Sequence, residues 1–315
     1  MTPNSTTCAV PMANLKPCGR PVHHAPADID QTSVCSMHSS DAGKDADLFT
    51  REVVGILNSS SAEMPTLDFT RFVFPVAQFL RRVFDRSCVF EHARFWTFPT
   101  FATCEFRAMA RFSGAVFEKG AIFQQSRFNQ RADFSGCVFL AHADFVHVVF
   151  GSDALFSGSI FREGVLGDLP PQGGNFTESI FAGNAKFNLS EFKGTAQFGG
   201  CGFNADADFS GCDLEQAQFS LTSFARDANF SRALIHDSAY FRNAQFLGFA
   251  NLNDMRVRGN SRQTTPSRAP RSFSASPWPK IPPALTLAIG GISPPGARPI
   301  TGWIFPPCPK PWPFI

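Results

Sequence analysis

The sequence is almost without tyrosine and has little tryptophan, although it is rich in phenylalanine. Tyr occurs once and Trp four times among 315 residues, against 37 Phe. An interior that relies on Phe uses the aromatic ring for its shape and apolarity, with no polar group to satisfy. Dependence on one large residue predicts one environment that is repeated many times along the chain.

Long hydrophobic runs are also missing. No stretch approaches the roughly 20 apolar residues that cross a bilayer, and the longest candidate, 281–292, has Pro282 and Pro283 near its start. The first residues lack the apolar stretch after a basic start that a secretory signal has. We therefore expect a cytoplasmic protein with no membrane association, whose nine Cys are thiols or metal ligands rather than disulfides.

Acidic residues are absent from the last part of the chain. Residues 255–315 contain eight basic residues and no Asp or Glu, whereas residues 66–254 contain 16 basic and 19 acidic residues. Neither segment has the concentrated positive charge of a nucleic-acid interface, so we expect no direct nucleic-acid binding. Nucleophile-elbow, HExxH, P-loop and dinucleotide motifs are missing too, and we expect no enzymatic activity.

Large apolar residues recur from Phe69 onward at alternating spacings of five and six. A small residue precedes most of them by two positions, with a polar residue between, as in Ala132-Asp133-Phe134. In a strand this pattern puts Ala and Phe on one face and Asp on the other. On a helix the two Phe of each 11-residue unit would lie about 140° apart, which excludes a helical interpretation. Short strands joined by turn residues predict coils that stack as a solenoid.

Two segments carry a family resemblance. Residues 132–139 (ADFSGCVF) and 207–214 (ADFSGCDL) resemble the A-(D/N)-(L/F)-x-x pattern of pentapeptide-repeat proteins, and they are closest to the Phe-rich type with alternating spacing. The resemblance covers 69–254. It implies an all-β fold, a right-handed quadrilateral parallel β-helix in which the central Phe and the small residue two before it point inward. Four faces per coil give about eight coils and a rod about 40 Å long.

The same resemblance, together with the missing catalytic motifs, bears on function. We expect a non-catalytic scaffold that presents flat polar faces to a protein partner. The alternative is modulation of a type II topoisomerase (gyrase) by mimicry of duplex DNA, an activity known in some family members. The low net negative charge of the repeat argues against mimicry. The oligomeric state stays open, with a homodimer as one candidate.

Eight of the nine Cys fall into two groups, and the ninth, Cys308, lies in the last part of the chain. Five occupy the small inward position, where we interpret them as packing residues rather than redox or catalytic groups: Cys88, Cys104, Cys137, Cys201 and Cys212. Outside the repeat, a C-x9-C-x16-C-x2-H pattern matches a structural zinc site, and its candidate ligands are Cys8, Cys18, Cys35 and His38.

The segment around this pattern has too few apolar residues to fold without such a metal. It resembles a Cys/His segment that precedes the repeats in some family members, with 18–21 (CGRP) as the matching stretch. A disordered leader is the alternative interpretation, and His23 and His24 are alternative ligands to His38.

The remaining segments complete the expected organisation: a zinc-binding segment (1–40), a capping helix and linker (41–65), the β-helix (66–258) and a Pro-rich tail (259–315). Residues 45–58 predict the helix that closes the open end of the coils, with an apolar face formed by Leu48, Phe49, Val53, Ile56 and Leu57. The break in the repeat at 167–174 predicts a surface loop, with a partner-contacting loop as the alternative. We interpret the tail as disordered, or as an out-of-frame extension.

Overall fold

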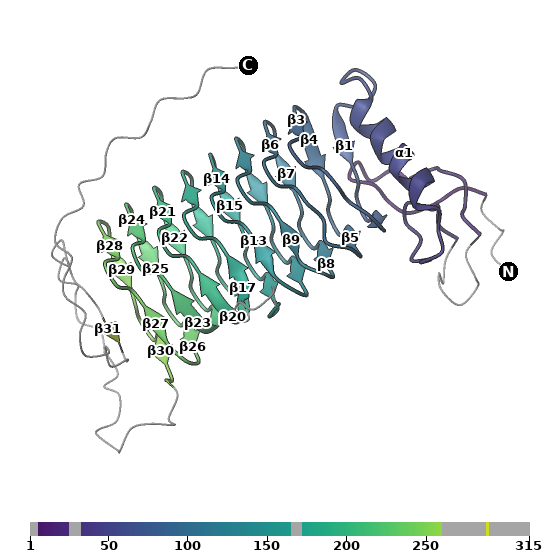
Figure 1. The fold of residues 1–315 in the computed structure, drawn as a ribbon. Helices are drawn as coiled ribbons and strands as arrows, with labels where there is room; N and C mark the ends of the chain where they lie inside the picture. The colour runs from purple at the N-terminus through teal and green to yellow at the C-terminus, as the bar shows by residue number, and fades with distance from the viewer. Residues whose placement is uncertain (1–5, 25–32, 165–171, 260–287, 290–315) are drawn as a thin grey trace.

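Short parallel strands stack in columns along one axis, and helix α1 lies at the N-terminal end of the stack (Figure 1). The computed structural model describes residues 6–24, 33–164, 172–259 and 288–289. One column has nine strands and another has eight, while a 14-stranded sheet contains two columns joined at one corner. The chain therefore winds through four faces per coil for about eight coils, which confirms the predicted parallel β-solenoid.

Each face is a column of strands that pair in parallel with their neighbours one coil away. Face 1 consists of β1 (Thr66–Asp68), β4 (Ser87–Val89), β7 (Ala110–Arg111), β11 (Ala132–Asp133), β15 (Ala154–Leu155), β19 (Ala185–Lys186), β22 (Ala207–Asp208), β25 (Ala228–Asn229) and β29 (Ala250–Asn251). Face 2 consists of β2 (Val73–Phe74), β5 (Arg94–Phe95), β8 (Val116–Phe117), β12 (Val138–Phe139), β16 (Ile160–Phe161), the first halves of β20 (Glu191–Gln197) and β23 (Asp213–Gln218), β26 (Leu234–Ile235) and β30 (Arg256–Val257).

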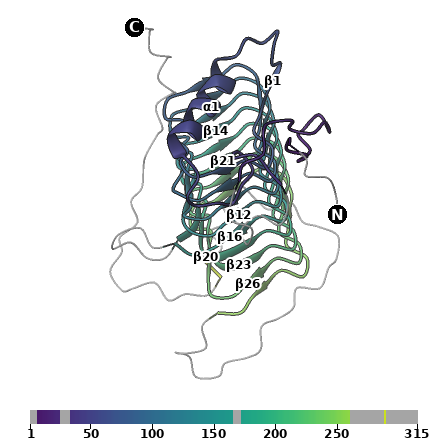
Figure 2. The same cartoon turned by 90° about the vertical axis from the view of Figure 1, so that its right-hand side faces the viewer.

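The other two faces follow the same rule. Face 3 consists of β9 (Ala121–Ile122), β13 (Ala143–Asp144), β17 (Gln172–Asn175), the second halves of β20 and β23, and β27 (Ala239–Tyr240), to which β31 (Ala288–Ile289) pairs antiparallel. Face 4 consists of β3 (Val83–Phe84), β6 (Glu105–Phe106), β10 (Arg127–Phe128), β14 (Val149–Phe150), β18 (Ile180–Phe181), β21 (Gly202–Phe203), β24 (Ser223–Phe224) and β28 (Gln245–Phe246). Figure 2 shows the stacked coils from a second side.

Pairing lays identical residues over one another. Phe128 pairs with Phe106 in one neighbouring coil and with Phe150 in the other. Because strands alternate their side chains between two faces, this register turns the central Phe and the small residue toward the interior. The central Phe from Phe69 to Phe241 are at most 5% exposed, so the predicted inward register is confirmed.

The interior is a set of phenylalanine ladders. The ring of Phe134 stacks on that of Phe112 at 4.8 Å and on that of Phe156 at 4.9 Å, with interplanar angles of 3° and 2°. Phe145 from another face meets Phe134 edge-on at 5.4 Å and 87°. The quadrupole of the aromatic ring favours both arrangements. Each pair stabilises the fold by about 0.5–1.5 kcal/mol beyond burial of its apolar area.

The small inward position also supplies hydrogen bonds. Cys137 Sγ donates to the carbonyl oxygen of Phe112 at 3.0 Å, and Ser159 Oγ donates to that of Phe134 at 2.6 Å. All five coil cysteines are at most 2% exposed, which confirms the packing interpretation. Burial raises the pKa of Cys104 to about 11 and the pKa values of Cys201 and Cys212 to about 12, so these thiols stay protonated.

The surface loop predicted at 167–174 ends earlier than the sequence suggested. Gly173 and Gly174 lie in β17, where Gly174 pairs with Ala143 and takes the small inward position before Phe176. A Cβ on Gly174 would lie 2.9 Å from ring atoms of Phe161 and Phe192, so only glycine fits there. The prediction of a loop through 174 is therefore wrong at its end, and residues 167–171 lie outside the described part of the chain.

Helix α1 (Ala46–Asn58) closes the N-terminal end of the coils, as predicted. Its N-cap is Asp45, whose carboxylate accepts hydrogen bonds from the backbone of Asp47 and Leu48, both at 2.9 Å. Phe49 packs edge-on against Phe74 at 5.3 Å, and the buried residues of the helix are Phe49, Val53 and Ile56. Leu48 is 44% exposed, because one residue before Phe49 lies about 100° around the helix. Its predicted place on the apolar face was wrong.

The first coil begins with β1 at Thr66, three residues before Phe69, where the repeat begins in the sequence. The Pro-rich tail lies outside the described residues, apart from residue 259 and the backbone of β31.

Candidate metal centre

A short hairpin brings the first two cysteines side by side. Antiparallel bridges join Thr7 to Pro21 and Pro11 to Pro17. Within it, Cys18 N donates to the carbonyl oxygen of Val10 at 2.8 Å, and Gly19 N donates to that of Cys8 at 2.9 Å. Gly19 has a φ of +71°, a conformation that glycine adopts without strain. The Cys-Gly pair thus turns the backbone so that both thiols point to the same side.

A tight turn positions the other two candidate ligands. His38 N and Ser39 N both donate to the carbonyl oxygen of Cys35, at 3.0 Å and 2.9 Å. This turn explains the x2 spacing, because it places Cys35 Sγ 3.2 Å from His38 Nδ1. Cys and His at this spacing act as a pair toward one tetrahedral ion.

The hairpin and the turn meet, and the four predicted ligands form one cluster. Cys8 Sγ lies 3.4 Å from His38 Nδ1, and Cys18 Sγ lies 3.7 Å from Cys35 Sγ. All four donor atoms lie within 4.8 Å of one another. Around a tetrahedral Zn²⁺ with bonds of about 2.3 Å to sulfur and 2.0–2.1 Å to nitrogen, ligand atoms stand about 3.5–3.8 Å apart. The residues present therefore fit this ion.

His38 is held in the tautomer that such a site needs. Its Nε2 lies 3.1 Å from the carbonyl oxygen of Thr70 and donates to it, which leaves Nδ1 as the free lone pair facing the thiols. The ring also stands edge-on to Phe72 at 5.2 Å. A carbonyl partner on the far nitrogen is typical of metal-ligating histidines.

Arg20 lies against the cluster from the outer side. Its Nη1 donates to Cys18 Sγ at 3.4 Å, its Nε lies 3.7 Å from a carboxylate oxygen of Glu52 on α1, and its guanidinium carbon stands 5.5 Å from the centre of the Phe72 ring. A positive group here offsets part of the negative charge that three thiolates bring to a divalent ion.

The thiols of Cys18 and Cys35 titrate as a pair. A hydrogen bond with the Cys35 thiol lowers the pKa of Cys18, and the same hydrogen bond together with burial raises the pKa of Cys35. The hydrogen bond between the two sulfurs thus favours one thiolate beside one thiol, and a divalent cation bound here would displace the remaining proton.

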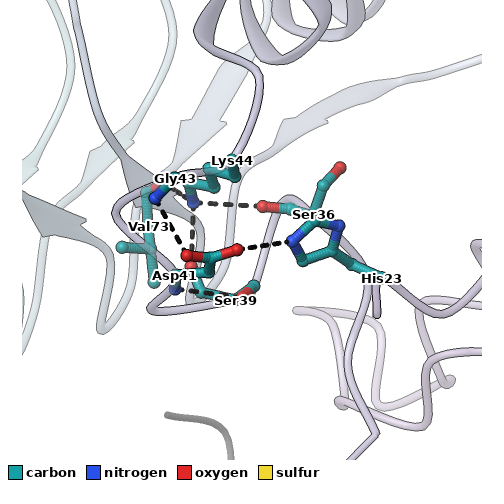
Figure 3. A network of polar contacts seen from close by, with 7 residues as sticks. All are labelled: His23, Ser36, Ser39, Asp41, Gly43, Lys44 and Val73. Carbon is teal, nitrogen blue, oxygen red and sulfur yellow. Dashed lines mark hydrogen bonds and ion pairs between the residues drawn. The ribbon is translucent and has the colours of Figure 1, made fainter. Parts of the chain in front are cut away.

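The alternative histidine ligands lie elsewhere. His23 Nε2 is 3.1 Å from a carboxylate oxygen of Asp41, which lowers the pKa of that carboxyl group (Figure 3). His24 is exposed. Within the described residues, the group close enough to share one ion consists of Cys8, Cys18, Cys35 and His38.

Lys44 was missed by the sequence analysis, although it connects the centre to the solenoid. Its ammonium group donates to the carbonyl oxygens of Ser36 at 3.0 Å, Ser39 at 2.9 Å and Val73 at 2.5 Å (Figure 3). The residue is 5% exposed, and the rings of Phe49 and Trp96 lie 4.9 Å and 5.0 Å from the nitrogen. One cation thereby binds the Cys35–His38 turn to the first coil. A single Lys among acidic neighbours gives no sequence signal for this role.

Arg86 connects the C-terminal end of α1 to the solenoid. Its guanidinium donates to the carbonyl oxygens of Leu57, Ser60 and Met64 and to Ser59 Oγ, at 2.6–3.2 Å. These include groups at the helix C-terminus that no helical partner satisfies. The Cys/His cluster, Lys44 and α1 together form one unit, which we call the N-terminal cap (described residues 6–24 and 33–64), and Arg86 of the solenoid binds it.

The fold and its repeats define a Phe-filled parallel β-solenoid with four faces. The family model for pentapeptide repeats, in nine copies, matches residues 96–138. These residues thus carry pentapeptide repeats, and the same Phe-rich register continues through the described coils of the solenoid. No curated protein matches the chain. In the described part of the chain, no helix is both long and apolar enough to span a membrane.

Proposed function

We propose that this protein is a non-catalytic scaffold that binds a protein partner on an outer face of the solenoid. The observation that supports it is the fixed register of the outward residues. On face 1, for example, Arg111, Asp133, Leu155, Lys186 and Asp208 follow one another in successive coils. A rigid core holds these side chains at intervals of about 4.8 Å, which gives a partner a preformed surface.

The outward carboxylates have structural partners of their own. Asp133 Oδ1 accepts a hydrogen bond from the backbone of Ser135 at 3.0 Å, and Asp208 does the same for Ser210 at 3.0 Å. These are the side-chain bonds that stabilise turns. The repeated acidic positions are thus accounted for without a catalytic role.

The second part of the proposal is a structural zinc ion in the N-terminal cap. Cys8, Cys18, Cys35 and His38 would hold it with four protein ligands, which closes the coordination sphere and leaves no position for a substrate. Three of the four side chains are at most 7% exposed. The ion would supply folding energy to a segment with few apolar residues.

The scaffold is tested by locating its binding face. A partner captured by the full chain is purified, and its affinity is measured for wild type and two surface variants. Lys186→Glu alters face 1, and Ile180→Lys alters face 4, where Ile180 is 43% exposed. A partner that uses one face binds one variant at least tenfold more weakly and the other normally, while both variants keep the wild-type melting temperature. Equal affinity of both variants and of further variants on faces 2 and 3 would contradict the proposal.

Mimicry of duplex DNA is the second candidate, because acidic groups recur along one edge of the rod. Asp153, Asp206 and Asp227 lie at the corner between faces 4 and 1. Their carboxylates accept hydrogen bonds from the backbone of the next coil at 2.9–3.3 Å, which ties them to the fold. A gyrase supercoiling assay with the full chain separates the two functions. The scaffold predicts no inhibition at micromolar protein, and inhibition that is lost in Asp206→Asn would favour mimicry.

A further inference from the structure

The cysteines of this protein lie in two chemically different settings. Those in the coils are buried and donate their S–H to a backbone carbonyl, as Cys201 does to Phe176 at 2.9 Å and Cys212 to Phe187 at 2.9 Å. In the N-terminal cap, three sulfurs face one another, and Cys18 is the ligand that is only part-buried. A reagent from solvent therefore reaches the cluster first at Cys18.

We propose that the metal centre is also a thiol-oxidation site, at which a peroxide links Cys18 to Cys35 and releases the metal. The 3.7 Å between their sulfurs requires a closure of about 1.7 Å to reach a disulfide bond length. Cys8 and Cys35 are each 1% exposed, so Cys18 is the point of attack. The inference rests on the proposed zinc ion, which holds the sulfurs as thiolates.

The reaction balances with one equivalent of hydrogen peroxide. The sulfur of Cys18 attacks one peroxide oxygen, the O–O bond breaks, and the thiolate becomes a sulfenic acid while the other oxygen leaves as water after taking up a proton. The sulfur of Cys35 then attacks the sulfur of Cys18, the S–O bond breaks, and a second water leaves with a second proton. Two thiolates lose two electrons to the peroxide, and the zinc ion loses two of its four ligands.

Release of the metal loosens the contacts between this cluster and the first coil. Val73 N donates to the carbonyl oxygen of Met37 at 2.8 Å, and His38 Nε2 donates to that of Thr70 at 3.1 Å. Lys44 joins the same turn to Val73. Once the Cys35–His38 turn is free, the outer edge of β2 loses its cover, and an uncovered strand edge can pair with another chain. Oxidation would therefore open the N-terminal end of the rod.

The experiment uses the full zinc-loaded chain with Cys308→Ser, since Cys308 lies outside the described residues. Hydrogen peroxide is added at increasing concentration, zinc release is followed with a chromogenic chelator, and disulfides are mapped by mass spectrometry. We expect one zinc released per Cys18–Cys35 disulfide, with the five coil cysteines still reduced. Hydrogen exchange should rise by at least tenfold in residues 34–38 and 66–74 and stay unchanged in coils beyond residue 132. A reductant with added zinc should reverse both changes.

A matched variant keeps four ligands and removes this chemistry. Cys18→His offers zinc a Cys2His2 set but has no sulfur at the entry point, so we expect zinc release by peroxide to slow at least tenfold. Zinc that stays bound while the cluster thiols stay reduced, at peroxide levels that oxidise free cysteine, would overturn this inference alone. A disulfide that includes a coil cysteine before zinc leaves would overturn it as well. A protein that never binds zinc would instead overturn the proposed metal site.

Discussion

The solenoid body and the N-terminal cap are stabilised in opposite ways. In the body each contact is repeated from coil to coil, so that Phe stacks on Phe and one small residue replaces another at the same position. In the cap each residue has one task that no other performs: Lys44 satisfies three carbonyl groups, Arg86 satisfies the end of α1, and four side chains surround one point.

This difference determines where the chain tolerates substitution. A repeated array loses a small share of its stability when one equivalent contact is weakened, because the neighbouring coils still pair. A cap made of single contacts loses an entire connection with one substitution. The effect of a substitution should therefore depend on where the residue lies, even for the same residue type, and four pairs of substitutions test this.

The largest effect is expected where the body receives a charge in its interior. Phe145→Asp removes a ring that stacks on Phe123 and Phe176 at 4.8 Å each and buries a carboxylate with no partner. We expect a loss of at least about 4 kcal/mol of unfolding free energy and little soluble protein. Asp144→Asn, one residue away and outward, keeps the oxygen that accepts from Val146 N and should be silent. Soluble yield and thermal melting compare the two, and equal effects would refute the assigned register.

The second test exchanges the same residue type in both regions. Cys35→Ser removes a ligand, so we expect loss of bound zinc and a rise of at least tenfold in hydrogen exchange over α1. Cys137→Ser should change stability by no more than about 1 kcal/mol, because Ser159 already makes the equivalent hydrogen bond in the next coil. Metal analysis and hydrogen exchange check both variants. Zinc retained in Cys35→Ser would show that the ligand set is wrong.

The third test removes the buried cation of the cap. Lys44→Met leaves three carbonyl oxygens without their donor, and we expect a cost of about 3 kcal/mol in the stability of the cap. Lys16→Met changes an exposed lysine of the hairpin and serves as the control. The stability of the cap is measured by chemical unfolding, with hydrogen exchange of α1 as the readout. A cap as stable in Lys44→Met as in the control would show that Lys44 does not stabilise it.

The smallest effect is expected from Arg20, which touches the centre without being a ligand. Arg20→Ala should weaken zinc binding about 10–100-fold, the usual range for groups that support metal ligands. Arg94→Ala removes an exposed ion pair to Glu118 in the body and should leave zinc affinity unchanged. Competition with a chelator of known affinity measures both. Identical affinities in the two variants would mean that Arg20 acts on packing alone.

The sequence predicted the body better than the cap, for a physical reason. The spacing of Phe and of the small residue before it encodes strand, face and register at once, and repetition lets one pattern be checked many times. The exception was Gly174, which sits at an inward position that its Pro- and Gly-rich surroundings disguised. From the sequence alone, a glycine at the small inward position cannot be told from a turn residue. The Phe rings packed around it in the structure make the difference clear.

In the cap, the ligand types and the x2 spacing were enough to nominate Cys8, Cys18, Cys35 and His38. The supporting residues were not predictable. Lys44 lies 29 residues from Val73, and Arg86 lies 22 residues from Met64, so their contacts depend on the three-dimensional arrangement. Long polar side chains also read as surface residues in a sequence. Leu48 was wrongly assigned to the apolar face of the helix. Five residues were predicted on that face, whereas only Phe49, Val53 and Ile56 are buried.

X-ray absorption at the zinc edge on the purified full chain shows directly whether the four side chains of the N-terminal cap hold zinc. We expect one zinc per chain with three sulfur neighbours at about 2.3 Å and one imidazole nitrogen at about 2.0–2.1 Å. The sulfur count should fall in Cys35→Ser and stay the same in Cys137→Ser. A chain with no zinc, or a zinc bound mainly by oxygen and nitrogen, would contradict the Cys3His site.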